Sequence, residues 1–278
     1  MLAKSVVTRV DQLHSDRKNF HTLWQQAGEL IYPLEQEFET TRTNGESLTD
    51  RIVDSTAPRA LEMFAGIMEH MLTPAHMKWH TLKINNAELA NKREAKLWLE
   101  EANNTLFALR YSNESNFSSQ MNSVFKNIGA FGTGTLFVDN AKPGFWYKSI
   151  PLSLGYLDTD YKGIVNRYYY VMKYNSEQAI EAFGEKNLPE EVVEDAQNGR
   201  TSEKMEFVQG VFPNKDYVKD SFKIKESKFI SVVVLKKDNS IVSKSYFKEF
   251  PFPTGRYAVA PNEIYGRGPG VTVLPDIK

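Results

Sequence analysis

The residue pattern changes near residue 130, and this change limits the possible folds more than any other feature of the sequence. Before it, apolar residues recur at the spacing of amphipathic helices. After it, short apolar runs are separated by turn-forming residues, as in β-strands. Helices first and strands later favour an α+β fold over alternating βαβ units. We therefore expect N-terminal helices packed against a mixed, mainly antiparallel β region.

Three successive parts are expected along the chain. Residues 1–130 make up the predicted helical part, and residues 131–260 a β-rich part that contains a helical insert. Residues 261–278 are rich in glycine and proline, which favours a loop-like linker. An amphipathic helix could start where this linker ends. The chain contains no internal repeat of the kind that indicates a solenoid or a propeller.

Four helices are predicted in the first part. Asp54 or Ser55 is a good N-cap for the second of them, and Pro58 falls in its first turn, where proline is favoured. The residue before Pro74 avoids the α region, so this helix ends there. The four predicted ranges are 20–31, 54–72, 86–110 and 116–129.

The second part contains six β-type runs and a charged insert. The last two runs flank a polar segment, 236–240, that is typical of a hairpin loop. The insert, 176–204, is expected to form a solvated face with a short helix near Glu177–Phe183 and another starting at Pro189. The six runs are 135–139, 145–150, 164–172, 207–212, 229–235 and 241–247.

Composition excludes several classes of protein. The 278 residues are 41% hydrophobic and carry a net charge of −1, so no basic excess points to nucleic-acid wrapping. With no cysteine, a disulfide framework, a thiolate metal site and thiol catalysis are excluded. No apolar run has the length of a signal peptide core or of a membrane span. We therefore expect a soluble, unsecreted protein that binds no membrane.

Two histidines, His76 and His80, have the four-residue spacing that places both rings on one helix face, as in zinc sites. However, Pro74 precedes them, and no glutamate lies between them to act as a base. The favoured interpretation is a helix-to-strand junction with Trp79 and Leu82 buried. A hydrolase that uses one of these histidines with a carboxylate is the alternative.

Two other patterns could bind phosphate or metal. The segment 132–135, Gly-Thr-Gly-Thr, lacks the lysine of a P-loop, so turns at the start of a strand explain it better. Asp139, Asp158 and Asp160 could hold a divalent ion or act as an acid and a base. A β-turn at residues 158–160, in which aspartate binds its own backbone, is favoured instead.

Three consecutive tyrosines, 168–170, lie between Arg167 and Lys173 and could form an aromatic and basic stripe for single-stranded nucleic acid. Neighbouring residues of a strand point to opposite faces, so at most two of the rings share a side. A half-buried strand is the favoured interpretation. The residues thus indicate no catalytic, cofactor-binding or metal-binding site.

Several segments, taken in order, resemble the portal (head-to-tail connector) proteins of T7-like short-tailed bacteriophages. The similarity extends over almost the whole chain, and its last segment is the most specific. The matching segments are 53–61 with Asp54 and Pro58, 72–79 with Pro74 and Trp79, 116–134, 249–256, and 265–278 with Tyr265, Gly266, Gly268, Pro269 and Pro275.

The resemblance implies a structural virion protein without enzymatic activity. Such proteins form a ring, twelve-fold in the virion, at one capsid vertex. The ring nucleates head assembly with capsid and scaffolding proteins, docks the terminase large subunit during genome packaging, and passes double-stranded DNA without sequence specificity. It then joins the tail adaptor and serves DNA ejection. Its implied locations are the virion and, during assembly, the host cytoplasm.

The resemblance also indicates which portion is present. Residues 1–260 correspond to the wing, and 261–278 would be a linker into a stem helix that this sequence does not contain. The helices at 54–72 and 86–110 are expected to take part in subunit packing or capsid contact. Another virion component, such as an adaptor or tail protein, is the second alternative.

Overall fold

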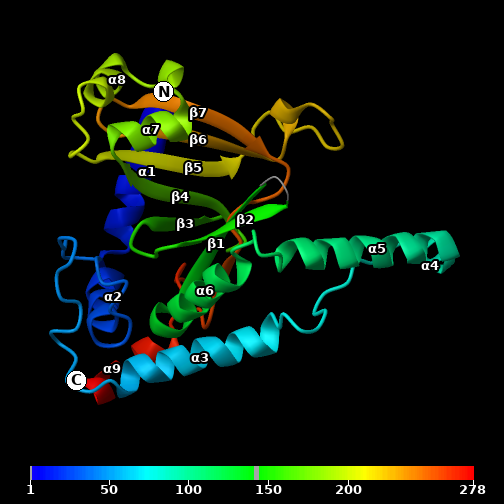
Figure 1. Cartoon of the computed structure of the whole chain (residues 1–278), viewed down its shortest axis with the longest axis horizontal. Coiled ribbons are helices and arrows are strands. Elements are labelled where there is room, and N and C mark those ends of the chain that lie inside the picture. The colour runs from blue at the N-terminus through cyan, green and yellow to red at the C-terminus, as the bar shows by residue number, and fades with distance from the viewer. Residues whose placement is uncertain (1, 141–143) are drawn as a thin grey trace.

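The computed structural model describes residues 2–140 and 144–278, and it shows an α+β fold with two antiparallel sheets (Figure 1). The helices are α1 (Leu2–Asp16), α2 (Lys18–Leu30), α3 (Thr56–Leu72), α4 (Ala87–Asn91), α5 (Arg93–Arg110), α6 (Phe117–Phe131), α7 (Ser176–Phe183), α8 (Glu190–Gln197) and α9 (Pro269–Ile277). The strands are β1 (Thr133–Asn140), β2 (Phe145–Ile150), β3 (Gly155–Thr159), β4 (Val165–Tyr174), β5 (Met205–Pro213), β6 (Phe229–Leu235), β7 (Ser240–Phe247) and β8 (Thr254–Arg256).

The larger sheet has the order β3-β4-β5-β6-β7, so each strand pairs with its neighbour in the sequence. The tyrosine run of β4 shows how its two faces are used. Tyr168 and Tyr170 belong to the main core, whereas Tyr169 packs with α1 residues on the other face. All three tyrosines are buried, so the aromatic and basic stripe for nucleic acid is wrong. The predicted strand is confirmed, although it is buried on both faces and not half-buried.

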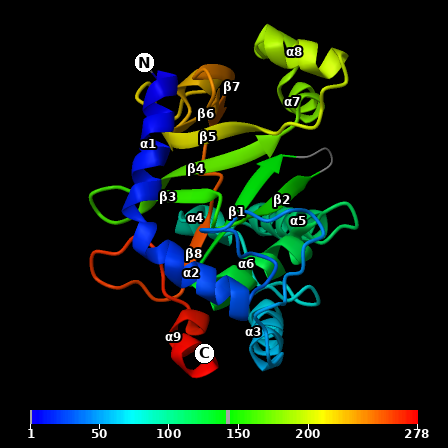
Figure 2. The ribbon, with the colours of Figure 1, turned by 90° about the vertical axis from the view of Figure 1, so that its left-hand side faces the viewer.

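Helix α1 covers one face of the larger sheet. Its buried residues Val6, Val10 and Leu13 recur at helical spacing and pack with sheet residues such as Val208 and Val232. Figure 2 shows α1 and α2 following one another down one side of the molecule. Helix α1 was not predicted from the sequence, although the apolar spacing of its residues is that of an amphipathic helix.

The smaller sheet, of order β2-β1-β8, packs against α6. Gly132 ends α6 in the left-handed region, with φ of 93°, and the chain enters β1 at the next residue. The expectation of a glycine turn leading into a strand is therefore confirmed. Helix α3 lies on α6, where Leu61 of α3 contacts Gly129.

Three differences from the expected elements have local causes. The helix predicted at 86–110 is two helices, because Lys92 adopts an extended conformation with ψ of 132°. β3 was not predicted, and Asp158 lies within it rather than in a turn. The linker expected at 261–278 is helical from Pro269, so the prediction of loop structure is wrong there. Within the described residues, no helix is both long and apolar enough to cross a bilayer.

Candidate functional site

The terminal motif begins with Tyr265, which is 4% exposed and lies between the helices and the larger sheet. Its ring meets Trp24 of α2 edge to face, with centroids 5.0 Å apart. Its hydroxyl accepts a hydrogen bond of 3.2 Å from the backbone N–H of Leu157 in β3. The residue that opens the motif therefore joins α2 to β3.

The glycines of the motif pass so close to other backbone atoms that no side chain fits. A Cβ on Gly266 would lie 2.3 Å from the carbonyl oxygen of Gly132, and one on Gly268 would lie 2.6 Å from that of Ile128. The Gly266 N–H also donates to the Thr133 hydroxyl at 2.9 Å. The motif is thus packed against the turn between α6 and β1.

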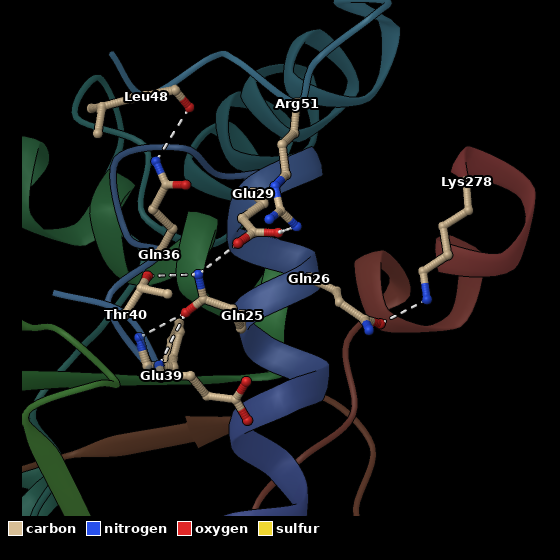
Figure 3. A network of polar contacts seen from close by, with 10 residues as sticks. Gln25, Gln26, Glu29, Gln36, Glu39, Thr40, Leu48, Arg51 and Lys278 are labelled. Atoms are coloured by element: carbon tan, nitrogen blue, oxygen red, sulfur yellow. Dashed lines mark hydrogen bonds and ion pairs between the residues drawn. The ribbon is translucent and has the colours of Figure 1, made fainter. Parts of the chain in front are cut away.

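The two prolines of the motif both belong to α9. Pro269 occupies the first turn, where its missing N–H leaves no helical bond unmade. Pro275 lies in the last turns of the same helix and is exposed. The end of α9 is tied to α2, because the Lys278 ammonium donates to Gln26 at 2.7 Å (Figure 3).

The loop that follows α2 is tied to that helix by a polar network (Figure 3). The side-chain oxygen of Gln25 accepts hydrogen bonds from two backbone N–H groups of this loop, those of Phe38 and Glu39. Glu29 accepts from Gln25 at 2.8 Å and pairs with Arg51 at 2.8 Å. These contacts hold the chain between α2 and α3 beside the end of α9.

A buried cation fixes the loop that connects the two sheets. Arg17, between α1 and α2, is 2% exposed and donates to the carbonyl oxygens of Leu152, Ser153 and Gly155 at 3.0, 2.7 and 2.5 Å. From the other side, the Glu35 carboxylate accepts from the backbone N–H groups of Leu152 and Ser153. Burial raises the pKa of Glu35 to about 7. We call this arrangement the joint.

Two histidines line the joint on the helix side. Arg17 Nε donates to His21 Nε2 at 2.9 Å, and its guanidinium lies 3.8 Å from the centroid of the Tyr156 ring. Burial, and then the charge of Arg17, lower the pKa of His21 to about 4. Burial also lowers the pKa of His14, whose ring lies 4.7 Å from that of His21. The His21 imidazole is therefore neutral at pH 7, and the lowered pKa of His14 favours its neutral form.

The earlier motif residues mark the two ends of α3. The helix starts at Thr56 with Ser55 as its N-cap and Pro58 in the first turn, so the predicted start is confirmed. The Ser55 side chain makes no capping bond, and Asp54 instead accepts a 3.0 Å hydrogen bond from the backbone N–H of Thr56. Pro74 is buried just after the helix ends at Leu72. Asp54 lines a pocket together with Val273 and Ile277 of α9, so the start of α3 lies beside the helix of the terminal motif.

Trp79 is not buried, so the prediction for this residue is wrong, as it is for Leu82; they are 38% and 40% exposed. The Trp79 indole donates to the Tyr111 hydroxyl at 3.0 Å, and the Arg110 guanidinium lies 4.9 Å from the centroid of its ring. Trp79 thereby attaches the chain after α3 to the C-terminal end of α5. This contact holds α5 in place where that helix projects from the rest of the molecule.

His76 and His80 do not form a pair. His76 stacks on His70 at 5.5 Å, whereas His80 lies 3.2 Å from the Arg110 guanidinium, and its pKa is lowered by burial and by that charge. Within residues 2–140 and 144–278, no group of three or more potential metal ligands occurs. This arrangement gives no support to a hydrolase built on these histidines.

The three aspartates that could bind a metal are likewise separate. Asp158 is buried and makes two hydrogen bonds, of 3.0 and 3.2 Å, with the Arg9 guanidinium. Asp160 accepts from backbone N–H groups of its own turn, as expected, while Asp139 is exposed at the end of β1. Asp158 therefore ties α1 to the larger sheet.

A helical arm projects from this body (Figure 1). We define the arm as α4, α5 and the segment 75–84, which runs beside α5 through bonds from Lys78 to Asn104 and from Leu82 to Asn103. Among the described residues of the arm's helices, none is buried. Leu97 and Trp98 are 56% and 64% exposed. Exposed apolar side chains gathered in this way indicate a contact surface.

Comparison with known proteins decides the family. A sequence profile described as "Bacteriophage head to tail connecting protein" matches residues 3–278. This chain belongs to that family. It is 25% identical over 283 residues to a "Probable portal protein" of Bordetella phage BPP-1, covering 99% of this chain and 50% of the relative. It is 24% identical over 280 residues to a "Portal protein" of Salmonella phage epsilon15, covering 98% of this chain and 50% of the relative.

The recognition of the head-to-tail connector family from the sequence is thus confirmed. The chain spans about half the length of the curated relatives that it matches. Sequence reasoning did not find Arg17 or Glu35, which hold the joint. The only local signal was a charged residue placed between two apolar helical patterns, and such residues are usually solvated.

Proposed function

We propose that this chain is the wing portion of a portal ring subunit, a structural component of the phage virion at one capsid vertex. The observation that carries the proposal is the family match over residues 3–278. Both relatives are named as portal proteins, which favours this role over that of an adaptor or tail component. In this proposal the protein has no enzymatic role.

The ring is proposed to have twelve subunits and to act throughout the life of the particle. It nucleates head assembly with capsid and scaffolding proteins, docks the terminase large subunit, and later joins the tail adaptor and serves DNA ejection. It works in the host cytoplasm during assembly and then in the virion. The net charge of −1 suits a passage for double-stranded DNA, because tight phosphate contacts would resist sliding.

We assign each of the three parts of the chain to a part of a portal subunit. Residues 1–130 and 131–260 together make the wing, and residues 261–278 connect it to a tunnel-lining stem helix. The relatives' greater length supports this division, since each is about twice as long as the matched region. In this proposal, helix α9 forms the connection between the wing and the stem helix. Its last residue, Lys278, is hydrogen-bonded to α2.

The exposed arm supports assembly into an oligomer. An isolated helix of 18 residues is only marginally stable in water, and α5 has no buried residue among those described. Its apolar residues Trp98, Leu99, Ala102 and Leu106 recur at helical spacing. A neighbouring subunit would cover such a stripe.

Electron microscopy of the protein produced from its whole reading frame tests this function. We expect rings with a central hole that is wide enough for double-stranded DNA. Particles that stay monomeric at high concentration, or closed discs without a hole, would contradict the proposal. Co-purification with the capsid protein and the terminase large subunit of the same phage separates a portal from a tail adaptor, because an adaptor is expected to bind neither.

A further inference from the structure

An apolar groove lies between α3 and α9, at the end of the molecule opposite to the arm (Figure 1). Its volume is about 280 Å³, and none of the described residues that line it carries a charge. Such a groove suits a large apolar side chain better than a polar ligand. Its walls include Ala60 and Phe64 of α3, Gly129 of α6, and Pro269, Val273 and Ile277 of α9.

The apolar surface continues along α3 beyond the groove. Met63, Ile67 and Met71 follow one another at four-residue spacing, so they lie in a row on one side of the helix. They are 68%, 52% and 71% exposed. Ala60 and Phe64 are their helical neighbours, which makes the row and the groove one continuous surface. We call it the α3–α9 surface.

The other unpartnered apolar surface is the arm tip, which we define as α4 with the first two turns of α5. It carries Leu89, Leu97 and Trp98, which are 44%, 56% and 64% exposed. Along the long axis of the molecule, the arm tip stands at one end and α9 at the other (Figure 1). A chain of this shape cannot place its own arm tip in its own groove.

We infer that the arm tip of one copy docks on the α3–α9 surface of a second copy, with Trp98 as the anchor in the groove. This inference rests on the proposed function and specifies which surfaces join the subunits. Because the two surfaces differ and lie at opposite ends, the contact is heterologous and repeats from copy to copy. Tryptophan seated in a desolvated pocket is a frequent energetic centre of such interfaces.

The face of α5 that carries Trp98 is acidic, and a basic residue borders the groove on the α3 side. Glu94 and Glu101 stand one helical turn before and after Trp98, on the same face of α5. Arg59 is exposed and directly precedes Ala60 of the groove. Arg59, Glu94 and Glu101 form no ion pair with any described residue. Docking with Glu94 and Glu101 toward Arg59, and away from Asp54 and Asp276 of the adjoining pocket, would fix orientation more than affinity.

Disulfide cross-linking tests the contact, because the chain has no cysteine of its own. Two single variants, Arg59→Cys and Glu101→Cys, each change an exposed residue beside the contact and leave Trp98 in place. Mixed and oxidised, they should give a 59–101 dimer in at least about ten-fold excess over the 59–59 and 101–101 dimers. A chain carrying both cysteines should give a ladder that extends beyond the dimer.

A control identifies the anchor. Trp98→Ala in the Glu101→Cys chain should reduce the mixed dimer by at least about ten-fold, whereas Trp146→Ala, which removes a 43% exposed tryptophan of β2, should leave it unchanged. The inference is overturned if the symmetric dimers match the mixed one, or if the two tryptophan variants behave alike.

Failure of this inference can be distinguished from failure of the proposed portal function. Symmetric cross-links in a protein that still forms rings would sink the inference and leave the portal function standing. A 59–101 ladder from a protein that forms open filaments without rings would support the inference and contradict the function.

Discussion

The joint and the arm differ in where their side chains find partners. At the joint, Arg17 is 2% exposed and its guanidinium donates to three backbone carbonyls of the same chain. On the arm, Trp98 is 64% exposed, and no described residue of α5 is buried. The joint therefore finds its partners within one chain, while the arm leaves its apolar side chains exposed. Substitutions at the joint should change folding, and those on the arm should change association.

The largest effect is expected for Arg17→Leu, which leaves buried carbonyl groups of the inter-sheet loop without donors. Unsatisfied buried groups cost about 1–3 kcal/mol each, so we expect a loss on the order of 3–5 kcal/mol in the free energy of unfolding. Urea unfolding measures it. Arg200→Leu is the matched control, because this side chain is 75% exposed and its ion pair with the accessible Asp195 should contribute less than about 1 kcal/mol. Equal losses for the two variants would contradict the description of the joint.

Gly266→Ala should cause the second-largest loss in the free energy of unfolding. The new Cβ would lie 2.3 Å from the carbonyl oxygen of Gly132, a backbone atom that cannot move aside without moving the turn. We expect a loss of about 1–3 kcal/mol in the same urea measurement. Gly66→Ala, in α3 with no atom within 4 Å, should instead be neutral or gain up to about 1 kcal/mol. A destabilising Gly66→Ala with a neutral Gly266→Ala would reverse this interpretation.

Two titrating groups of the joint should make the stability of the protein depend on pH in opposite directions. The pKa of Glu35 is raised to about 7, so its folded form keeps a proton that the unfolded chain loses, and stability falls as pH rises from 4.5 to 7. The pKa of His21 is lowered to about 4, so stability is lost as pH falls from 6.5 to 4. Between these limits the two contributions cancel in part.

Single variants separate these contributions. Glu35→Gln removes the first one, so its stability should rise more steeply than that of the unchanged protein between pH 4.5 and 6.5. His21→Gln should do the opposite. Each slope is bounded by about 1.4 kcal/mol per pH unit for one proton. Urea unfolding at three pH values within this window measures both, and parallel curves for all three proteins would show that neither group is perturbed.

The smallest effect on folding is expected on the arm. Trp98→Ala should change the free energy of unfolding by less than about 0.5 kcal/mol, because an exposed side chain with few contacts is removed. Its effect should be seen in the sedimentation of concentrated protein, where association weakens. A loss of folding stability comparable to that of Gly266→Ala would mean that the arm is completed within its own chain.

The local sequence pattern was sufficient to predict most of the individual helices and strands. Asp54 and Pro58 marked the start of α3, and the polar segment 236–240 marked the turn between β6 and β7. The break at Lys92 was not predicted, because the apolar spacing continues across it and only the backbone conformation ends the helix. β3 was missed because its five residues carry aspartate and threonine, which are typical of turns.

The candidate site was less predictable, because its contacts join segments far apart in the chain. The family resemblance singled out Gly266 and Gly268, but only the fold shows that they pack on the turn at Gly132. Arg17 carries no local signal of burial, since its partners are carbonyls some 135 residues away. Trp79 was expected to be buried because large aromatic residues usually are, and here it lies on a projecting arm.

The close packing of the glycines at the start of α9 has a mechanical consequence. A Cβ on Gly270 would lie 2.8 Å from the carbonyl oxygen of Ala130, so the first turn of α9 rests directly on the last turn of α6. Lys278 fastens the other end of α9 to α2. A load that tilts α9 would therefore press on the backbone of α6 before any side chain could yield. The terminal motif would then act as a stiff coupling between these two helices.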